Sequence, residues 1–119
     1  MEARAGETIT LHESHATRGL YDLVYLGQNI GHARLSTSGY IWDVEVDVEH
    51  RGRGRGKLLM LKMIERARYD GHPWVRVRVH DVNHVATTMY RQLGFKDTVT
   101  HGYDTVGHWV EAELEIDDV

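Results

Sequence analysis

The sequence predicts a mixed α/β fold of the α+β kind: a mostly antiparallel central sheet of about seven strands with two main helices. Most segments alternate polar and apolar residues, which is the pattern of half-buried strands, and two segments repeat apolar residues at helical spacing. The chain of 119 residues has the usual size of one domain. We therefore expect a single domain over residues 1–119.

Four strands are expected in the first 50 residues, where alternating segments are separated by short turns rich in Gly, Ser and Asn. These strands are 7–13, 20–26, 30–35 and 40–48. The fourth alternates strictly, so its apolar residues should share one face and its acidic residues the other. The apolar residues are Trp42, Val44, Val46 and Val48, and the acidic residues are Asp43, Glu45 and Asp47.

The rest of the chain alternates between helical and extended patterns. A helix is expected from about Gly54 to Tyr69, before the stop signals Gly71 and Pro73. Its apolar stripe is Leu58, Leu61, Met63, Ile64 and Ala67. The remaining expected elements are a strand over 74–80, a helix over 83–93 and strands over 95–101 and 107–116.

Composition excludes several classes of protein. The sequence has no cysteine, which excludes disulfide scaffolds, thiolate zinc sites and cysteine nucleophiles. A formal net charge of −4 argues against bulk nucleic-acid binding. No stretch approaches the roughly 20 apolar residues of a membrane span, and no signal peptide is recognisable. A cytoplasmic protein without membrane contact is expected.

A glycine-rich turn joins the fourth strand to the first helix. Its residues are Arg51, Gly52, Arg53, Gly54, Arg55, Gly56 and Lys57. Residues without Cβ let backbone N–H groups converge, and the positive end of the helix dipole adds to their attraction for phosphate. The turn therefore indicates a pyrophosphate cradle, with the basic side chains available for peripheral phosphates.

Three other interpretations of this turn fit the sequence less well. A flexible Arg/Gly loop does not fit the apolar strand and helix on either side. A dinucleotide-binding turn would place its third glycine one residue later and lie within a βαβ unit. A minor-groove hook shares Arg-Gly-Arg but usually carries a proline, which is missing here.

Two motifs together resemble the GNAT superfamily of acyl-CoA-dependent N-acetyltransferases, of which this would be a short member. The first is Val46-x-Val48 followed by Arg51-x-x-Gly54-x-Gly56. The second runs from Asn83 through Ala86, Met89 and Tyr90 to Leu93-Gly94-Phe95. Their order, with a strand between them, agrees with the family's fold.

The resemblance implies acetyl-CoA as co-substrate and gives individual residues their roles. Val46 and Val48 would contact the pantetheine arm, residues 51–56 would bind the pyrophosphate, and Lys57 would be available to the peripheral phosphates of the cofactor. Asn83 would contact the cofactor or its strand. Tyr90 would also face the cofactor and protonate the leaving thiolate.

One departure from the family concerns the connection between the first two strands. Typical members carry one or two helices there, whereas this chain has about six residues, 14–19. Those helices usually wall the acceptor site. The site should therefore be unusually open or be completed by another subunit, and a homodimer is a hypothesis.

Amide formation from a thioester requires a base for the amine, because an alkylammonium has a pKa near 10.4. The candidates are Asp43 and Glu45, with Glu45 nearer the expected thioester, and His80 is a rival. The acidic strand face favours a primary amine on a small cationic molecule, or a protein lysine or N-terminus, as acceptor. No metal is expected, since Asn83 should cap the helix between His80 and His84.

The sequence therefore predicts an N-acetyltransferase that moves an acetyl group from acetyl-CoA to a primary amine by direct attack on the thioester. The alternative is a non-catalytic acyl-CoA-binding or protein-interaction module on the same fold. The glycine turn and Tyr90 favour catalysis.

Overall fold

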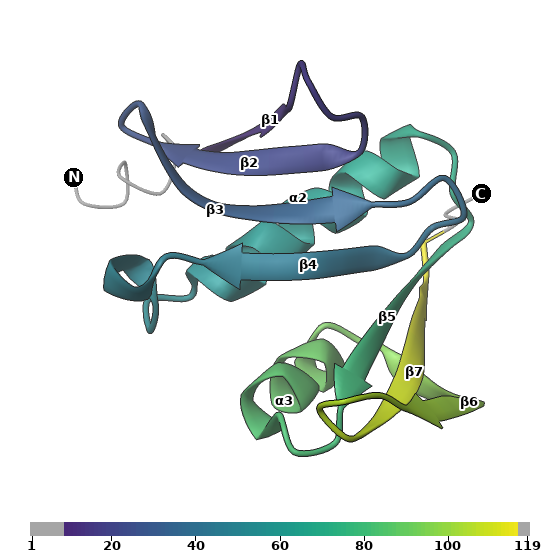
Figure 1. Ribbon diagram of the computed structural model, residues 1–119. Helices are drawn as coiled ribbons and strands as arrows, with labels where there is room; N and C mark the ends of the chain where they lie inside the picture. Colours follow the sequence, from purple (N-terminus) through teal and green to yellow (C-terminus); the bar gives the residue numbers. More distant parts are fainter. Residues whose placement is uncertain (1–8, 117–119) are drawn as a thin grey trace.

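The computed structural model describes residues 9–116 and contains two sheets (Figure 1). The first has the order β1-β2-β3-β4 and the second the order β5-β7-β6. The strands are β1 (Thr10–Glu13), β2 (Leu20–Tyr25), β3 (Gln28–Leu35), β4 (Ile41–Val46), β5 (Trp74–His80), β6 (Lys96–Tyr103) and β7 (His108–Glu115). The helices are the 3₁₀ turn η1 (Val48–His50), α2 (Arg55–Tyr69) and α3 (His84–Gln92). Over these residues the predicted mixed fold, with seven strands and two main helices, is confirmed.

Every pair of neighbouring strands within a sheet is antiparallel. The hairpin between β2 and β3 turns at Leu26 and Gly27, whose φ angles are 52° and 79°. Two consecutive positive φ angles match the twist of antiparallel strands in a two-residue hairpin. Strand β3 therefore begins at Gln28, two residues before the predicted start at Ile30.

The predicted fourth strand was too long. Strand β4 ends at Val46, and Val48 lies in η1 with 75% of its surface exposed. The prediction that Trp42 shares a face with Val44 and Val46 is also wrong. The register between β3 and β4 shifts between His32 and Arg34, and Asp43 has a φ of 54°. This β-bulge reverses the alternation, so Ile41 is buried and Trp42 is exposed.

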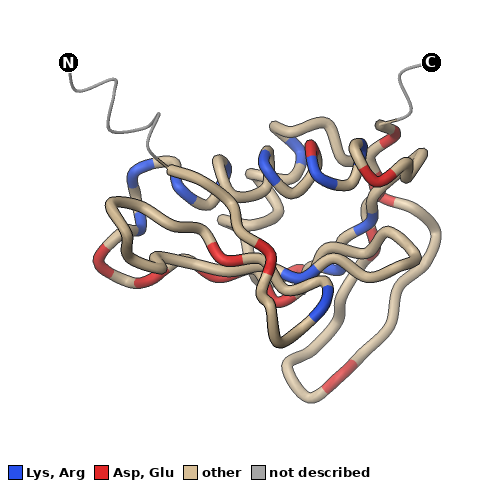
Figure 2. The backbone as a smooth tube through the Cα atoms, turned by 90° about the horizontal axis from the view of Figure 1, so that it is seen from above, with Lys and Arg blue, Asp and Glu red and all other residues tan. Residues whose placement is uncertain are grey.

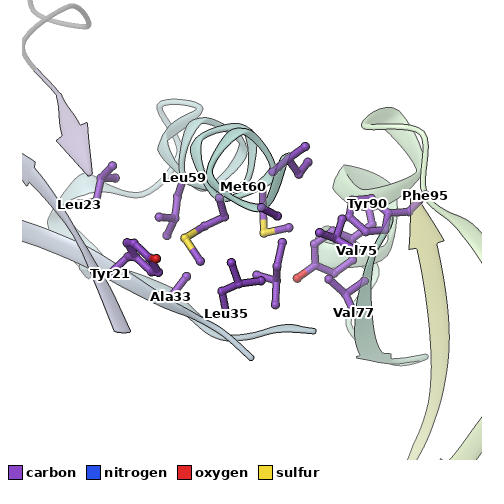
Figure 3. Close-up of a cluster of buried hydrophobic side chains, with 14 of the residues drawn as sticks. Tyr21, Leu23, Ala33, Leu35, Leu59, Met60, Val75, Val77, Tyr90 and Phe95 are labelled. Carbon is purple, nitrogen blue, oxygen red and sulfur yellow. The ribbon is translucent and has the colours of Figure 1, made fainter. Parts of the chain in front are cut away.

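Helix α2 packs against β3, β4 and β5 and supplies the centre of the core. Figure 3 shows Leu59 and Met60 above side chains of the first sheet, with Val75, Val77 and Tyr90 beside them. The buried residues of α2 are Leu59, Met60, Met63, Ile64 and Ala67. Met63, Ile64 and Ala67 are thus buried as predicted, whereas the predicted Leu58 is only partly buried and Leu61 is 47% exposed. Met60 is buried in place of Leu61 because it lies one helical turn before Met63 and Ile64 on the same face.

Charged residues of both signs are interspersed along the backbone (Figure 2). Within residues 9–116, no helix is long and apolar enough to cross a membrane.

Truncation of a buried side chain of α2 should destabilise the fold. Leu59 is fully buried, at 0% exposure, and we expect Leu59→Ala to lower the free energy of unfolding by about 2–5 kcal/mol. Leu61→Ala on the same helix is the matched control, since Leu61 is 47% exposed. Urea unfolding followed by circular dichroism measures both, and equal losses would contradict this assignment of the core.

Candidate functional site

The two sheets separate where β4 and β5 diverge (Figure 1). In the part of the chain that the structure describes, the bridge between them is Tyr40 with Arg76, where the Arg76 N–H donates to the Gly39 carbonyl at 2.9 Å. Beyond this bridge, β4 and β5 are both edge strands of their sheets. Their facing backbone groups are therefore available to a ligand.

The glycine turn stands at the mouth of this opening. Gly52 and Gly54 have φ angles of 78° and 75°, in the region that favours glycine. Gly54 is the N-cap of α2 and has no side chain to cap it. Within residues 9–116, no protein group accepts a hydrogen bond from the backbone N–H groups of residues 52–57. These donors and the helix N-terminus together form a site suited to phosphate.

A groove of about 670 Å³ runs from the turn along β4 to α3. Its lining brings together the predicted cofactor residues Val46, Arg51, Gly52, Gly54, Gly56, Lys57, Asn83 and Tyr90, and also Glu45. Three predicted residues lie elsewhere. Val48 is in η1, Arg53 is an exposed turn residue, and the Arg55 guanidinium lies over the Tyr25 ring at 5.0 Å.

A second pocket, of about 600 Å³, lies on the other side of the opening. The two strands supply most of its wall, including Trp42, Asp43, Arg78 and His80, and Tyr40 lines it just before β4. The groove and the pocket share Val44, Asn83, Ala86 and Tyr90 as lining residues. Two ligands, one in the groove and one in the pocket, would therefore meet beside Tyr90.

Tyr90 is held at this junction by helix α3. The Asn83 side chain caps the helix by accepting the Ala86 N–H at 3.1 Å, as predicted for a cap. The Tyr90 ring packs on Phe95 with ring centroids 5.5 Å apart. Burial raises the pKa of the Tyr90 hydroxyl above its usual value of 10.0, so the hydroxyl remains a proton donor at neutral pH.

The acidic residues of β4 do not form the free cluster that their alternation suggested. Asp43 pairs with Arg34 at 2.9 Å and His32 at 3.4 Å, and the Arg34 hydrogen bond lowers the pKa of its carboxyl. Glu45 lies 3.6 Å from the Arg51 guanidinium. Asp47 precedes η1 and lines neither cavity. The negative charge of Asp43 is therefore balanced by a cation on the neighbouring strand, and that of Glu45 by a cation of the turn.

The structure adds a partner for His80 that sequence reasoning missed. The Asp104 carboxylate, in the turn between β6 and β7, lies 2.8 and 3.0 Å from His80 Nε2. Asp104 also accepts the Val106 N–H at 2.9 Å. The His80 hydrogen bond lowers the pKa of Asp104 below its ordinary value, so its carboxylate stays ionised at neutral pH. The two residues are 24 positions apart in the sequence, so no local pattern connects them.

Potential metal ligands are dispersed in this region. Within residues 9–116, no group of three His, Asp or Glu side chains is placed to hold a metal ion. His80 pairs with Asp104 and His84 begins α3, so the two histidines do not converge on one ion.

The family model described as the acetyltransferase (GNAT) family matches residues 3–95, which is most of the chain. The chain belongs to this family. It is thus a GNAT acetyltransferase domain, and its groove and pocket lie between the two sheets of that fold. The connection between β1 and β2 is a loop without a helix, as the sequence predicted for this short GNAT domain.

Relatives of this GNAT domain agree in fold. A GNAT acetyltransferase from Elizabethkingia anophelis, solved with acetyl-CoA bound, superposes with a TM-score of 0.76 at 14% identity over 92% of this chain and 99% of its own. The ribosomal-protein-S18-alanine N-acetyltransferase of Escherichia coli gives a TM-score of 0.72 at 19% identity, over 99% and 76%.

The mycothiol acetyltransferase of Thermobifida fusca is similar in sequence. It is 38% identical over 58 residues, or 49% of this GNAT domain. The matched segment is 18% of the length of that relative.

A side chain at position 56 should obstruct the groove. Gly56 has an ordinary helical φ, and a Cβ there would meet only the Met89 Sδ, at 3.8 Å. The protein itself can therefore accommodate Gly56→Val, but the variant should lose at least about tenfold in affinity for coenzyme A by calorimetry. Gly54→Val is a poorer test because of its positive φ.

Glu65→Val is the matched control for Gly56→Val, since it adds the same side chain to an exposed position of α2. Unchanged coenzyme A affinity in Gly56→Val would remove the turn from the binding site.

Proposed function

We propose that the protein is an N-acetyltransferase that moves the acetyl group of acetyl-CoA to a primary amine. The observation that carries this proposal is the meeting of the groove and the pocket at Tyr90. One cavity begins at a turn of free N–H groups, and the other ends at a histidine paired with a carboxylate. The acetyl-CoA bound to the Elizabethkingia anophelis structure supports this proposal, and so do the names of the other two relatives, which are both acetyltransferases.

The residues of the groove fit acetyl-CoA. The N–H groups of residues 52–57 and the side chains of Arg51 and Lys57 would hold the phosphates, and the edge of β4 at Val44 to Val46 would hold the extended arm. When bound, acetyl-CoA supplies an activated acetyl group: a C–N bond to the amine forms as the C–S bond breaks.

His80 is the base that the geometry favours. Because the ionised Asp104 accepts the proton on His80 Nε2, the neutral ring keeps Nδ1 as its basic nitrogen. Within residues 9–116, no protein group forms a hydrogen bond with Nδ1. His80 lines the pocket and takes the proton that the acceptor ammonium must lose before attack.

The carboxylate candidates are less suited to this role. The pKa of Asp43 is lowered by Arg34, so its carboxylate holds a proton weakly. Glu45 lines the groove, not the pocket, and lies beside Arg51.

Tyr90 acts at the other end of the reaction. Its hydroxyl, protonated at neutral pH, donates its proton to the departing sulfur, so the products are the acetamide and a free thiol. The Tyr90 phenolate then takes a proton from the solvent. His80 releases to the solvent the proton that it removed from the amine.

Removal of the Tyr90 hydroxyl should slow turnover without weakening cofactor binding. We expect Tyr90→Phe to lower kcat by about 10²-fold, measured as thiol release from acetyl-CoA. The acetyl-CoA affinity should stay the same by calorimetry. Tyr69→Phe, at an exposed position of α2, is the control, and equal kcat values for the two variants would leave Tyr90 a packing residue.

The pH dependence of kcat/KM distinguishes the two remaining bases. We expect His80→Gln to lower kcat/KM by about 10²- to 10⁴-fold and to abolish the acidic limb of the pH–rate profile. Glu45→Gln should retain that limb. If Glu45→Gln abolishes it instead, Glu45 is the base. If wild type binds acetyl-CoA but releases no thiol with any amine, the protein is an acyl-CoA-binding module.

A further inference from the structure

The pocket that would hold the acceptor is lined by a cation, Arg78, that has no anionic partner among residues 9–116. Its side chain lies on β5 two residues before His80 and lines the same pocket. Among residues 9–116, no carboxylate lies within ion-pair distance of its guanidinium, and none of its N–H groups donates to a protein acceptor. The negative groups around the pocket, by contrast, have partners.

Aromatic rings hold the Arg78 guanidinium in place. Its carbon lies 4.4 Å from the centroid of the Trp109 ring and 5.4 Å from that of Tyr40. Such stacking orients a guanidinium while leaving its N–H edge available, and that edge matches the two oxygens of a carboxylate. An arginine oriented in this way loses less conformational entropy when it binds an anion.

Glu111 is opposite Arg78 in the register of β5 and β7, but other groups occupy its carboxylate. One oxygen accepts the Tyr40 hydroxyl, and the other accepts the Thr98 hydroxyl at 2.9 Å. Its nearest basic group is Arg76, at 3.8 Å. Glu111 is also buried, so it is not a competitor for a ligand in the pocket.

We propose that the acceptor is a small amino acid, a primary amine that also carries a carboxylate, and that Arg78 binds this carboxylate. This inference rests on the proposed N-acetyltransferase function. It replaces the cationic acceptor that the acidic residues of β4 suggested. Arg78 and His80 are on one face of β5, about 7 Å apart along the strand, so one molecule reaches both.

Because Arg78 and His80 both line the pocket, each end of the acceptor has its own binding partner. The carboxylate accepts two N–H groups of Arg78, and the amine faces His80, which removes its proton. The exposed ring of Trp42, on the opposite strand, forms an apolar wall for the rest of the molecule. Arg78 is thus a specificity-determining residue, and its effect should be on KM more than on kcat.

The test compares each acceptor with and without its carboxylate. Thiol release from acetyl-CoA is measured with glycine, L-leucine and L-phenylalanine, each against its α-amide, for wild type, Arg78→Gln and Arg78→Lys. An α-amide also changes the basicity of the amine, so the decisive quantity is the ratio of wild type to variant for each acceptor. We expect Arg78→Gln to raise KM at least about tenfold for the acids and less than about twofold for the amides, with Arg78→Lys intermediate.

Arg18→Gln, an exposed arginine in the loop between β1 and β2, is the matched control and should leave both acceptor series unchanged. Equal effects of Arg78→Gln on acids and amides would overturn the proposal. So would turnover with polyamines or lysine peptides in place of amino acids, which would leave the N-acetyltransferase function standing. Failure to bind acetyl-CoA in calorimetry would instead reject the proposed function itself.

Discussion

The divergence of β4 from β5 is the constraint on which the site depends. Strands in a sheet normally satisfy each other's N–H and C=O groups, but these two strands meet at Tyr40 and Arg76 and then separate. Helix α2 packs against both strands, and the Tyr40 hydroxyl bonds to buried Glu111 at the closed end. The opening is therefore fixed by the core on one side and by the hydrogen bond between Tyr40 and Glu111 on the other.

Local patterns were sufficient to predict most of the elements. The alternation of Val75, Val77 and Val79 specifies β5, and the order Gly52, Gly54, Gly56 before an apolar helix specifies the turn. These features depend on residues close in sequence. The bulge at Asp43 could not be predicted in this way, because strict alternation over 40–48 is also what an unbroken strand would show.

The charges of the site also could not be predicted from local patterns, because their partners lie on other elements of the fold. Asp43 and Glu45 looked like a free acidic face, but Arg34 on β3 and Arg51 after η1 lie beside them in space. The pairing of His80 with Asp104 likewise depends on β6 and β7 folding back onto β5. Electrostatic predictions from one strand fail where its neighbours supply the countercharge.

The bulge in β4 has a consequence for how this domain could change its specificity. It divides the strand into a segment beside the pocket, Ile41 to Asp43, and a segment beside the groove, Val44 to Val46. Because Trp42 points away from the core, its replacement leaves the packing of α2 and the pairing of Val46 with Gly31 intact. The pocket side of β4 can thus be altered by mutation at Trp42 while the residues of the same strand that line the groove stay in place.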